Sequence, residues 1–307
     1  MTFWLVAAAV VLAAIVPFVF ESMRRSMDDR ARKSAPGELA DLPQGATHFQ
    51  WQGPEDGPVA VCVHGLTTPS YVWSPIAGHL ANRGFRVLTY DLYGRGFSAR
   101  VKGRQDSTFF NAQLNALLEQ QDVKDDITLL GYSMGGAIAT SFAGSFPERI
   151  RKLCIIAPAG YGIDLGSFAM IAQRAGIVGY WYMLTFYGRI LRKSVNAERH
   201  LPSSVPDIFD KQIAETRIKG FHYAVWSSLR GILSEDLEPA QSIIQERKIP
   251  TLAIWAEKDA VIPISGTDIL REWNSDAKNM VIEGAEHAVA YVNVTEVCKS
   301  LDEFLEI

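Results

Sequence analysis

From Thr47 onward, short apolar runs alternate with longer amphipathic segments. The apolar runs are rich in β-branched residues and continuous rather than alternating, which is typical of strands covered on both faces. The expected strands are Val59–Val63, Arg86–Tyr90, Ile127–Leu130, Leu153–Ile156, Thr251–Trp255 and Asn279–Ile282. The expected helices are Pro75–Arg83, Ser107–Gln120, Met134–Phe146, Ile264–Trp273 and Val292–Glu306. This alternation predicts an α/β fold, a mostly parallel sheet with helices on both faces.

One region interrupts the alternation. Residues 160–239 contain no clear strand but many aromatic residues at helical spacing. Because this stretch is too long for a bare loop in a compact domain, we expect a helical cap inserted into a core made of residues 47–159 and 240–307. The aromatic residues either form the interior of this cap or line an apolar pocket, and Trp181 and Tyr182 are the candidates for substrate binding.

The N-terminus has a different character. Phe3–Phe20 is an uncharged run of 18 residues, close to the length that crosses a bilayer. A cleaved signal peptide is the competing interpretation, but it favours a basic start and a shorter apolar core. Residues 1–22 are therefore predicted to be a single-pass transmembrane anchor, and residues 23–46 a polar linker. The basic residues follow the run, which places the body on the cytoplasmic side: Arg24, Arg25, Arg30, Arg32 and Lys33.

Composition excludes some classes of function. The 307 residues carry a net charge of −4 with no broad basic face, so a nucleic-acid partner is not expected. The three cysteines, Cys62, Cys154 and Cys298, have no metal-ligand spacing, and we expect free buried thiols in a reducing compartment. No metal or other cofactor is predicted, and no pattern indicates an oligomeric state.

Candidate chemistry begins at "GYSMG", Gly131 to Gly135, between an expected strand and an expected helix. Gly-x-Ser-x-Gly in that context is a nucleophile elbow, in which a sharp turn exposes Ser133 above the sheet edge. The glycines lack a Cβ, which lets neighbouring backbone approach the turn, and the helix N-terminus favours a developing negative charge. A purely structural turn is the alternative.

A serine nucleophile needs a base, and the base needs an orienting acid. His287 follows the last expected strand, and Asp259 follows the strand before it. Both therefore arrive at the carboxyl edge of the sheet, where Ser133 also lies. The order Ser, Asp, His along the chain is that of the nucleophile-elbow hydrolases. Glu257 and the more remote Asp164 are rival acids.

The segment "VHGL" follows the strand Val59–Val63. Its position predicts that the backbone N–H of Leu66, together with that of Met134, holds a tetrahedral oxyanion. Gly65 allows the substrate and the turn to approach closely. A simple turn at a strand end is the alternative.

Taken together, these segments resemble the α/β-hydrolase fold superfamily over Thr47 to Ile307. The resemblance is carried by "VHGL", "YDLYGRGFS", "GYSMGG" and the segments around Asp259 and His287. It implies a cap inserted after the sixth strand of the core sheet, where residues 160–239 lie. "GYSMGG" is similar to the carboxylesterase, monoacylglycerol lipase and carbon–carbon bond hydrolase branches. Haloalkane dehalogenases and epoxide hydrolases carry Asp where this chain has Ser133, and proline iminopeptidases carry Trp where it has Met134.

The expected function is hydrolysis of carboxylic esters of lipophilic substrates through an acyl-enzyme. The expected partners are a small-molecule ester or lipid and, through the N-terminal helix, a membrane. Such an anchor is a departure from most bacterial members of the superfamily. A thioesterase or carbon–carbon bond hydrolase with the same three residues is one alternative, and a non-catalytic membrane-anchored binding protein on the same fold is another.

Overall fold

A twisted sheet of eight strands organises the body of the protein. The computed structural model describes residues 2–162 and 166–307. The strand order is β1-β2-β4-β3-β5-β6-β7-β8. The six strands from β4 to β8 in that order are parallel, whereas β1 and β2 are antiparallel to their neighbours. The predicted α/β architecture is confirmed. The strands are β1 (Glu38–Leu42), β2 (Gly45–Gln52), β3 (Val59–Val63), β4 (Arg86–Tyr90), β5 (Ile127–Tyr132), β6 (Ile150–Ile156), β7 (Thr251–Ala256) and β8 (Lys278–Ile282).

The β1–β2 hairpin is absent from the sequence prediction. A polar linker was expected up to residue 46, whereas the sheet begins at Glu38. β1 is an edge strand that buries Ala40 and Leu42 and exposes its other side chains. Five residues with two buried side chains give no apolar run, so pairing with β2 rather than local composition makes this segment a strand. The predicted linker is therefore corrected at its C-terminal end.

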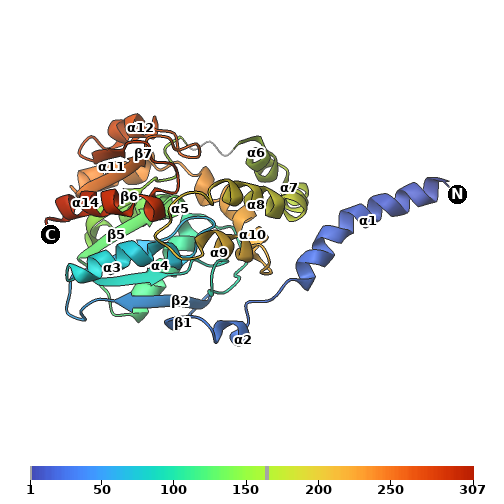
Figure 1. The fold of residues 1–307 in the computed structure, drawn as a ribbon, viewed down its shortest axis with the longest axis horizontal. Helices are drawn as coiled ribbons and strands as arrows, with labels where there is room; N and C mark the ends of the chain where they lie inside the picture. The colour runs from blue at the N-terminus through green and yellow to red at the C-terminus, as the bar shows by residue number, and fades with distance from the viewer. Residues whose placement is uncertain (1, 163–165) are drawn as a thin grey trace.

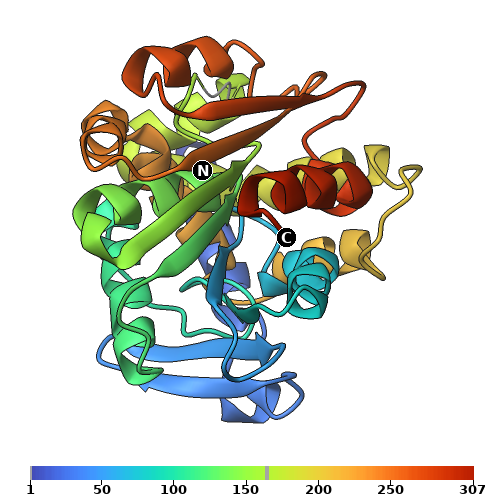
Figure 2. The same ribbon diagram turned by 90° about the vertical axis from the view of Figure 1, so that its left-hand side faces the viewer.

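Helices cover both faces of the sheet. α3 and α14 pack on one face, and α4, α5, α11 and α12 pack on the other. Figure 2 shows the layers, with α3 (cyan) and α14 (red) on one side of the sheet and α5 (green) on the other. The bounds are α3 (Ser74–Asn82), α4 (Ser107–Gln120), α5 (Met134–Ser145), α11 (Glu238–Glu246), α12 (Gly266–Trp273), α13 (Val289–Val292) and α14 (Val294–Leu305).

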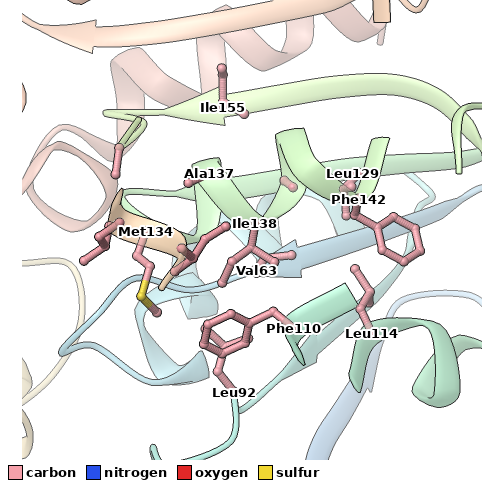
Figure 3. Close-up of a cluster of buried hydrophobic side chains, with 14 of the residues drawn as sticks. Val63, Leu92, Phe110, Leu114, Leu129, Met134, Ala137, Ile138, Phe142 and Ile155 are labelled. Atoms are coloured by element: carbon pink, nitrogen blue, oxygen red, sulfur yellow. The ribbon is translucent and has the colours of Figure 1, made fainter. Parts of the chain in front are cut away.

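The core explains why the strands read as continuous apolar runs. All six residues of β5 and all six of β7 are buried, because helices cover both of their faces. In Figure 3, Phe110 of α4 and Ile138 and Phe142 of α5 gather over Val63 and Leu129 of β3 and β5. This packing fixes α5 against the sheet, and α5 is the helix that begins directly after Ser133.

The predicted insertion folds as helices over the carboxyl edge of the sheet (Figure 1). Its aromatic side chains pack on one another; Tyr182, for example, stacks on Phe168 with ring centroids 4.6 Å apart, and Tyr180 lies 5.2 Å from Trp226. The aromatic residues thus form the interior of the cap. The described cap helices are α6 (Gly166–Arg174), α7 (Gly176–Tyr182), a π-helix (Met183–Tyr187), α8 (Gly188–Ala197), α9 (Ile208–Glu215) and α10 (Phe221–Arg230).

The N-terminal segment forms one long helix, α1 (Thr2–Met23), followed by the short α2 (Asp29–Arg32). Figure 1 shows that α1 projects away from the body on the side of the cap. It is long and apolar enough to cross a membrane, and none of its apolar window is buried. A signal sequence near an N-terminus can also be this long and apolar. The helix contacts the cap, where the Trp181 indole donates to the Ala13 carbonyl at 3.1 Å.

Candidate active site

Ser133 lies on a sharp turn between β5 and α5. Its backbone has φ 54° and ψ −120°, a conformation that costs free energy for a residue with a Cβ. A Cβ on Gly131 would lie 2.2 Å from the Gly135 carbonyl oxygen, and a Cβ on Gly135 would lie 2.0 Å from that of Val63. Only glycine fits at these two positions, and the turn therefore holds the serine side chain above the strand end.

Two loops bring a histidine and a carboxylate to this serine. Ser133 Oγ lies 3.0 Å from His287 Nε2, and His287 Nδ1 lies 2.7 Å from Asp259 Oδ2. A carboxylate only accepts hydrogen bonds, so the proton is on Nδ1 and Nε2 accepts from the serine hydroxyl. Tyr132 also holds the histidine loop: its hydroxyl donates to the His287 carbonyl at 2.8 Å and its ring stacks on the imidazole.

The local backbone fixes Asp259 in place. The carboxylate follows β7, and its Oδ1 accepts from the N–H groups of Val261 and Ile262, both at 2.8 Å. Its side chain is buried, with 1% of its surface exposed. The rival Glu257 instead accepts from the Gly284 N–H at the surface. The other rival, Asp164, lies outside the described residues.

The loop after β3 lies beside the serine. A Cβ on Gly65 would lie 3.3 Å from the Ser133 Cβ, so the backbone approaches the turn closely. Within residues 2–162 and 166–307, the Leu66 N–H donates to no acceptor. Met134 is the first residue of α5, so its N–H has no intrahelical partner. Both residues border the cavity at Ser133.

The buried His64 side chain stabilises this loop through two hydrogen bonds. Its Nδ1–H donates to the Gly65 carbonyl at 2.8 Å, and its Nε2 accepts from the Leu92 N–H at 2.9 Å. Burial lowers the pKa of His64 to about 4, so the ring is neutral at physiological pH. A neutral ring with one donor and one acceptor satisfies both bonds, which makes His64 a support for the loop.

The segment "YDLYGRGFS" is held by a buried acid. Asp91 accepts from the N–H groups of Ser70 and Phe97, both at 2.9 Å, and pairs with His48 at 2.8 Å. Burial by itself raises the pKa of Asp91, but the hydrogen bond and charge of His48 outweigh burial and hold that pKa well below its usual range. Asp91 is therefore an ionised anchor for the loop that follows β4.

Arg95 connects this loop to the cap. The side chain is fully buried, and its guanidinium donates to the Leu66 carbonyl at 3.3 Å. On the cap side it donates to the Ala224 carbonyl at 3.2 Å and to the Ser228 hydroxyl at 2.7 Å in α10. The same side chain thus fixes the peptide of Leu66 and a cap helix.

Glu215 of α9 gives the contact between cap and core a pH dependence. It accepts from the Gly96 N–H at 3.1 Å and lies 3.7 Å from Arg100. Burial raises the pKa of Glu215 to about 7, although Arg100 opposes the shift. Between pH ~4.5 and ~7 the folded protein holds a proton that the unfolded chain has released, so the free energy of unfolding falls by up to about 3 kcal/mol as the pH rises.

Glu215→Gln should remove this pH dependence. Urea denaturation of the full chain at pH 5 and pH 8, in one detergent, measures it. Glu246→Gln, at an exposed position of α11, is the matched control and should retain the wild-type slope. A Glu215→Gln protein with an unchanged difference between the two pH values would contradict the assignment.

A cavity of about 170 Å³ opens at Ser133 and His287. Its apolar lining comes from Leu66, Met134, Leu191, Val195, Leu233 and Val261. Its polar lining carries hydroxyl, amide and carboxyl groups, from Thr67, Thr68, Ser194, Glu198, Gln212 and Tyr291. The Tyr291 hydroxyl donates to Glu198 at 3.2 Å, and burial raises the pKa of Glu198 despite that bond.

The structure brings together some, but not all, of the predicted site residues. Ser133, Asp259 and His287 meet, and Gly65, Leu66 and Met134 lie around the serine. Neither Trp181 nor Tyr182 lines the cavity. Trp181 lies against α1 and Tyr182 stacks inside the cap, so the prediction that they bind substrate is corrected. The helical spacing of these aromatic residues therefore indicated packing between cap helices and not a substrate pocket.

Sequence reasoning missed the polar residues that line the cavity. Glu198 and Gln212 come from the cap, and Tyr291 lies in α13 behind the histidine loop. No motif surrounds these residues, and scattered polar residues on amphipathic helices ordinarily face solvent. Docking of the cap on the sheet brings Glu198 and Gln212 to Ser133, whereas Tyr291 arrives with the core segment that follows His287.

Comparisons with known proteins identify the family of this chain. A lipase of Psychrobacter immobilis, Lipase 1, is 26% identical over 263 residues, which cover 82% of this chain and 80% of the lipase. The pimeloyl-[acyl-carrier protein] methyl ester esterase of Aliivibrio salmonicida is 25% identical and covers 85% of this chain and 97% of its own. The crystal structure of a membrane phospholipase A, described as a bacterial virulence factor, superposes with a TM-score of 0.72 at 20% identity, covering 99% of this chain and 96% of its own. The family model for the alpha/beta hydrolase fold matches residues 58–294. The chain therefore belongs to the α/β-hydrolase fold family.

Proposed function

We propose that this protein hydrolyses carboxylic esters of lipophilic acids through an acyl-enzyme. The observation that supports this most strongly is the aligned Ser133–His287–Asp259 chain of hydrogen bonds, at 3.0 and 2.7 Å, at the edge of a cavity. Serine hydroxyls are weak nucleophiles, and this arrangement is the one that activates them. The ester-cleaving relatives support the same chemistry.

In the first step, Ser133 Oγ attacks the ester carbonyl carbon while His287 Nε2 takes the hydroxyl proton. The carbonyl oxygen becomes an anion, which the N–H groups of Leu66 and Met134 stabilise. Asp259 keeps the imidazole oriented and stabilises its cationic form. The C–O bond to the alcohol then breaks, His287 returns the proton to the leaving oxygen, and the acyl group remains on Ser133.

In the second step, a water molecule takes the place of the serine hydroxyl as the nucleophile and attacks the acyl-enzyme. His287 accepts a proton from a water molecule as its oxygen attacks the acyl carbon, and the same two N–H groups hold the second oxyanion. The bond to Ser133 breaks, His287 returns the proton to the serine oxygen, and the carboxylic acid leaves. No cofactor takes part in either step.

The mixed lining of the cavity indicates the substrate class. Its apolar residues, including Leu191 and Val195, suit an acyl chain. Its polar residues suit a hydroxylated alcohol such as glycerol. Gln212 is 4% exposed, and its Nε2 has no hydrogen-bond partner among the described residues. A buried donor without a partner is costly, and a hydroxyl oxygen of the alcohol would satisfy it. A monoacylglycerol-like ester therefore fits better than a thioester.

A substrate panel tests this proposal. We expect a monoacylglycerol to be hydrolysed with a higher kcat/KM than the methyl ester or the thioester of the same acid. Gln212→Met, which keeps the chain length, should lower kcat/KM for the monoacylglycerol by about 10-fold, the value of one hydrogen bond, and leave the methyl ester unchanged. Equal losses on both esters would remove Gln212 from the alcohol subsite. If the thioester has the highest kcat/KM for every acyl chain, the protein is a thioesterase and the ester proposal is wrong.

We also propose that α1 is a retained anchor and that the body faces the cytoplasm. The helix is 22 residues long, and basic residues follow it. Its end is built into the fold: Glu21 pairs with Arg24 and accepts from the Gly220 N–H at 2.6 Å, and Arg24 contacts His222. A leader that is removed needs no such contacts with a cap helix.

A further inference from the structure

The surface where α1 meets the cap is strongly basic. Two hollows flank the end of α1, one of about 400 Å³ and one of about 670 Å³. Among residues 2–162 and 166–307, the only acid that lines them is Glu21, which already pairs with Arg24. Seven basic residues line them: Arg24, Arg189, Arg192 and Arg217 on one side, and Arg100, Lys102 and Lys219 on the other.

Most of these cations have no counter-ion. Arg189, Arg192 and Arg217 are exposed, and so are Lys102 and Lys219. None of the five forms an ion pair within the described part of the chain. The chain as a whole has a net charge of −4, so this is a local concentration of positive charge. Such a surface is complementary to an anionic partner.

Exposed apolar side chains lie on α6 and α7, and one of them, Ile177, lines the larger hollow. Ile177 and Val178 of α7 are 67% and 63% exposed, and Met170 and Ile171 of α6 are 46% and 49% exposed. The aromatic rings of Tyr180, Tyr223 and Trp226 line the larger hollow. Apolar tips flanked by aromatic and basic residues are typical of proteins that lie in the headgroup region of a bilayer.

The contacts with α1 fix the height of this surface. Trp181 of α7 bonds to Ala13, ten residues before the end of the helix, which corresponds to about 15 Å along its axis. The whole helix is about 33 Å long, little more than the ~30 Å hydrocarbon core that it must cross. With α1 across the membrane and Met23 at its surface, the contact with Trp181 therefore lies inside the hydrocarbon core, whereas the arginines around Arg24 lie at the level of the headgroups.

We propose that this docking face, formed by Arg189, Arg192, Arg217, Ile177 and Val178, binds an anionic phospholipid bilayer. The arginines contact lipid phosphates, and the two apolar side chains enter the acyl boundary. A bilayer is the fitting partner because the face is continuous with α1. The inference holds whatever reaction Ser133 performs, and it requires that α1 lies in the membrane.

Docking also has a consequence for the cavity. Helix α8 carries Leu191 and Val195 toward the cavity and Arg189 and Arg192 toward the hollow beside α1. One helix, about 10 Å across, therefore separates the cavity from the bilayer surface.

The test uses the full chain reconstituted into phosphatidylcholine vesicles, with or without phosphatidylglycerol. A polarity-sensitive fluorophore on Val178→Cys reports docking, and labelled wild type serves as the blank because all three of its cysteines are buried. We expect the probe to enter a less polar environment in the anionic vesicles, with quenching by brominated lipid. High salt should reverse this shift, because salt screens the arginine–phosphate attraction.

Charge-removal variants make the test specific. Replacing Arg189, Arg192 and Arg217 together by Gln should weaken docking about 100-fold, from about 1 kcal/mol for each basic residue near an anionic surface. The control replaces Lys124, Arg247 and Lys299, exposed cations remote from α1, and should dock as wild type.

Vesicle flotation separates docking from anchoring. If the chain floats with neutral and anionic vesicles alike and the probe stays in water in both, the docking face is overturned. Equal losses in the test and control variants would also overturn it, because bulk charge would then explain binding. A chain that does not float overturns both the anchor and the docking face. A shift that requires a second copy of the chain at fixed lipid would assign the face to self-association.

Discussion

Ser133→Ala is expected to lower kcat for ester hydrolysis by about 10⁶-fold, the loss typical of removing a serine nucleophile that acts with a histidine base. The substitution removes the only atom that forms the acyl bond. Folding should be unaffected, because alanine also has a Cβ and fits wherever serine does. The measurement is turnover of a p-nitrophenyl acyl ester, together with labelling by a fluorophosphonate probe.

Ser145→Ala is the matched control for this variant. Ser145 is the last residue of α5, the helix that begins directly after Ser133, and it is exposed. It should keep both turnover and label. An Ser133→Ala protein that still hydrolyses the ester, or that still takes up the probe at an equal rate, would show that another nucleophile operates.

Asp259→Asn is expected to lower kcat by about 10⁴-fold while leaving KM nearly unchanged. The amide occupies the same space but presents an N–H₂ group or a weaker acceptor to His287 Nδ1. The wrong tautomer then places a proton on Nε2, which can no longer accept the one from Ser133. The loss should also appear as a slower reaction with the fluorophosphonate probe.

Glu257→Gln separates the two carboxylates that sequence reasoning proposed. Glu257 is two residues from Asp259 but points to the Gly284 N–H at 2.7 Å. The Glu257→Gln variant should therefore turn over the ester within a few-fold of the wild-type rate. A large loss in Glu257→Gln combined with a small loss in Asp259→Asn would reverse the assignment of the orienting acid.

Some parts of this fold follow from local patterns. The strands β3 and β4 and the helix α4 have the bounds that apolar periodicity predicted. β3 and β4 lie inside the sheet and carry continuous apolar runs, whereas α4 covers the sheet and carries a clear amphipathic pattern. The edge strand β1 has two buried side chains and no such signal, and its conformation depends on the hydrogen bonds that β2 offers.

The candidate site divides in the same way. Ser133, Asp259 and His287 were predictable as neighbours because parallel strands end at one edge of a sheet. Their roles remain predictions that the two experiments above test. Trp181 and Tyr182 were predicted to bind substrate because they are aromatic. The residue type does not determine whether a side chain faces the cavity, the interior of the cap or α1.

The order of motifs along the chain was enough to define the α/β core, the strand–turn–helix around Ser133, and an apolar N-terminal helix. These features depend on residues close together in sequence, whose spacing records which backbone conformation they favour. The contribution of Glu198 and Gln212 to the cavity, the link from Arg95 to α10 and the basic face beside α1 depend on how the cap docks. That docking is the sum of many weak contacts between segments far apart in the chain, and no single stretch of sequence records it.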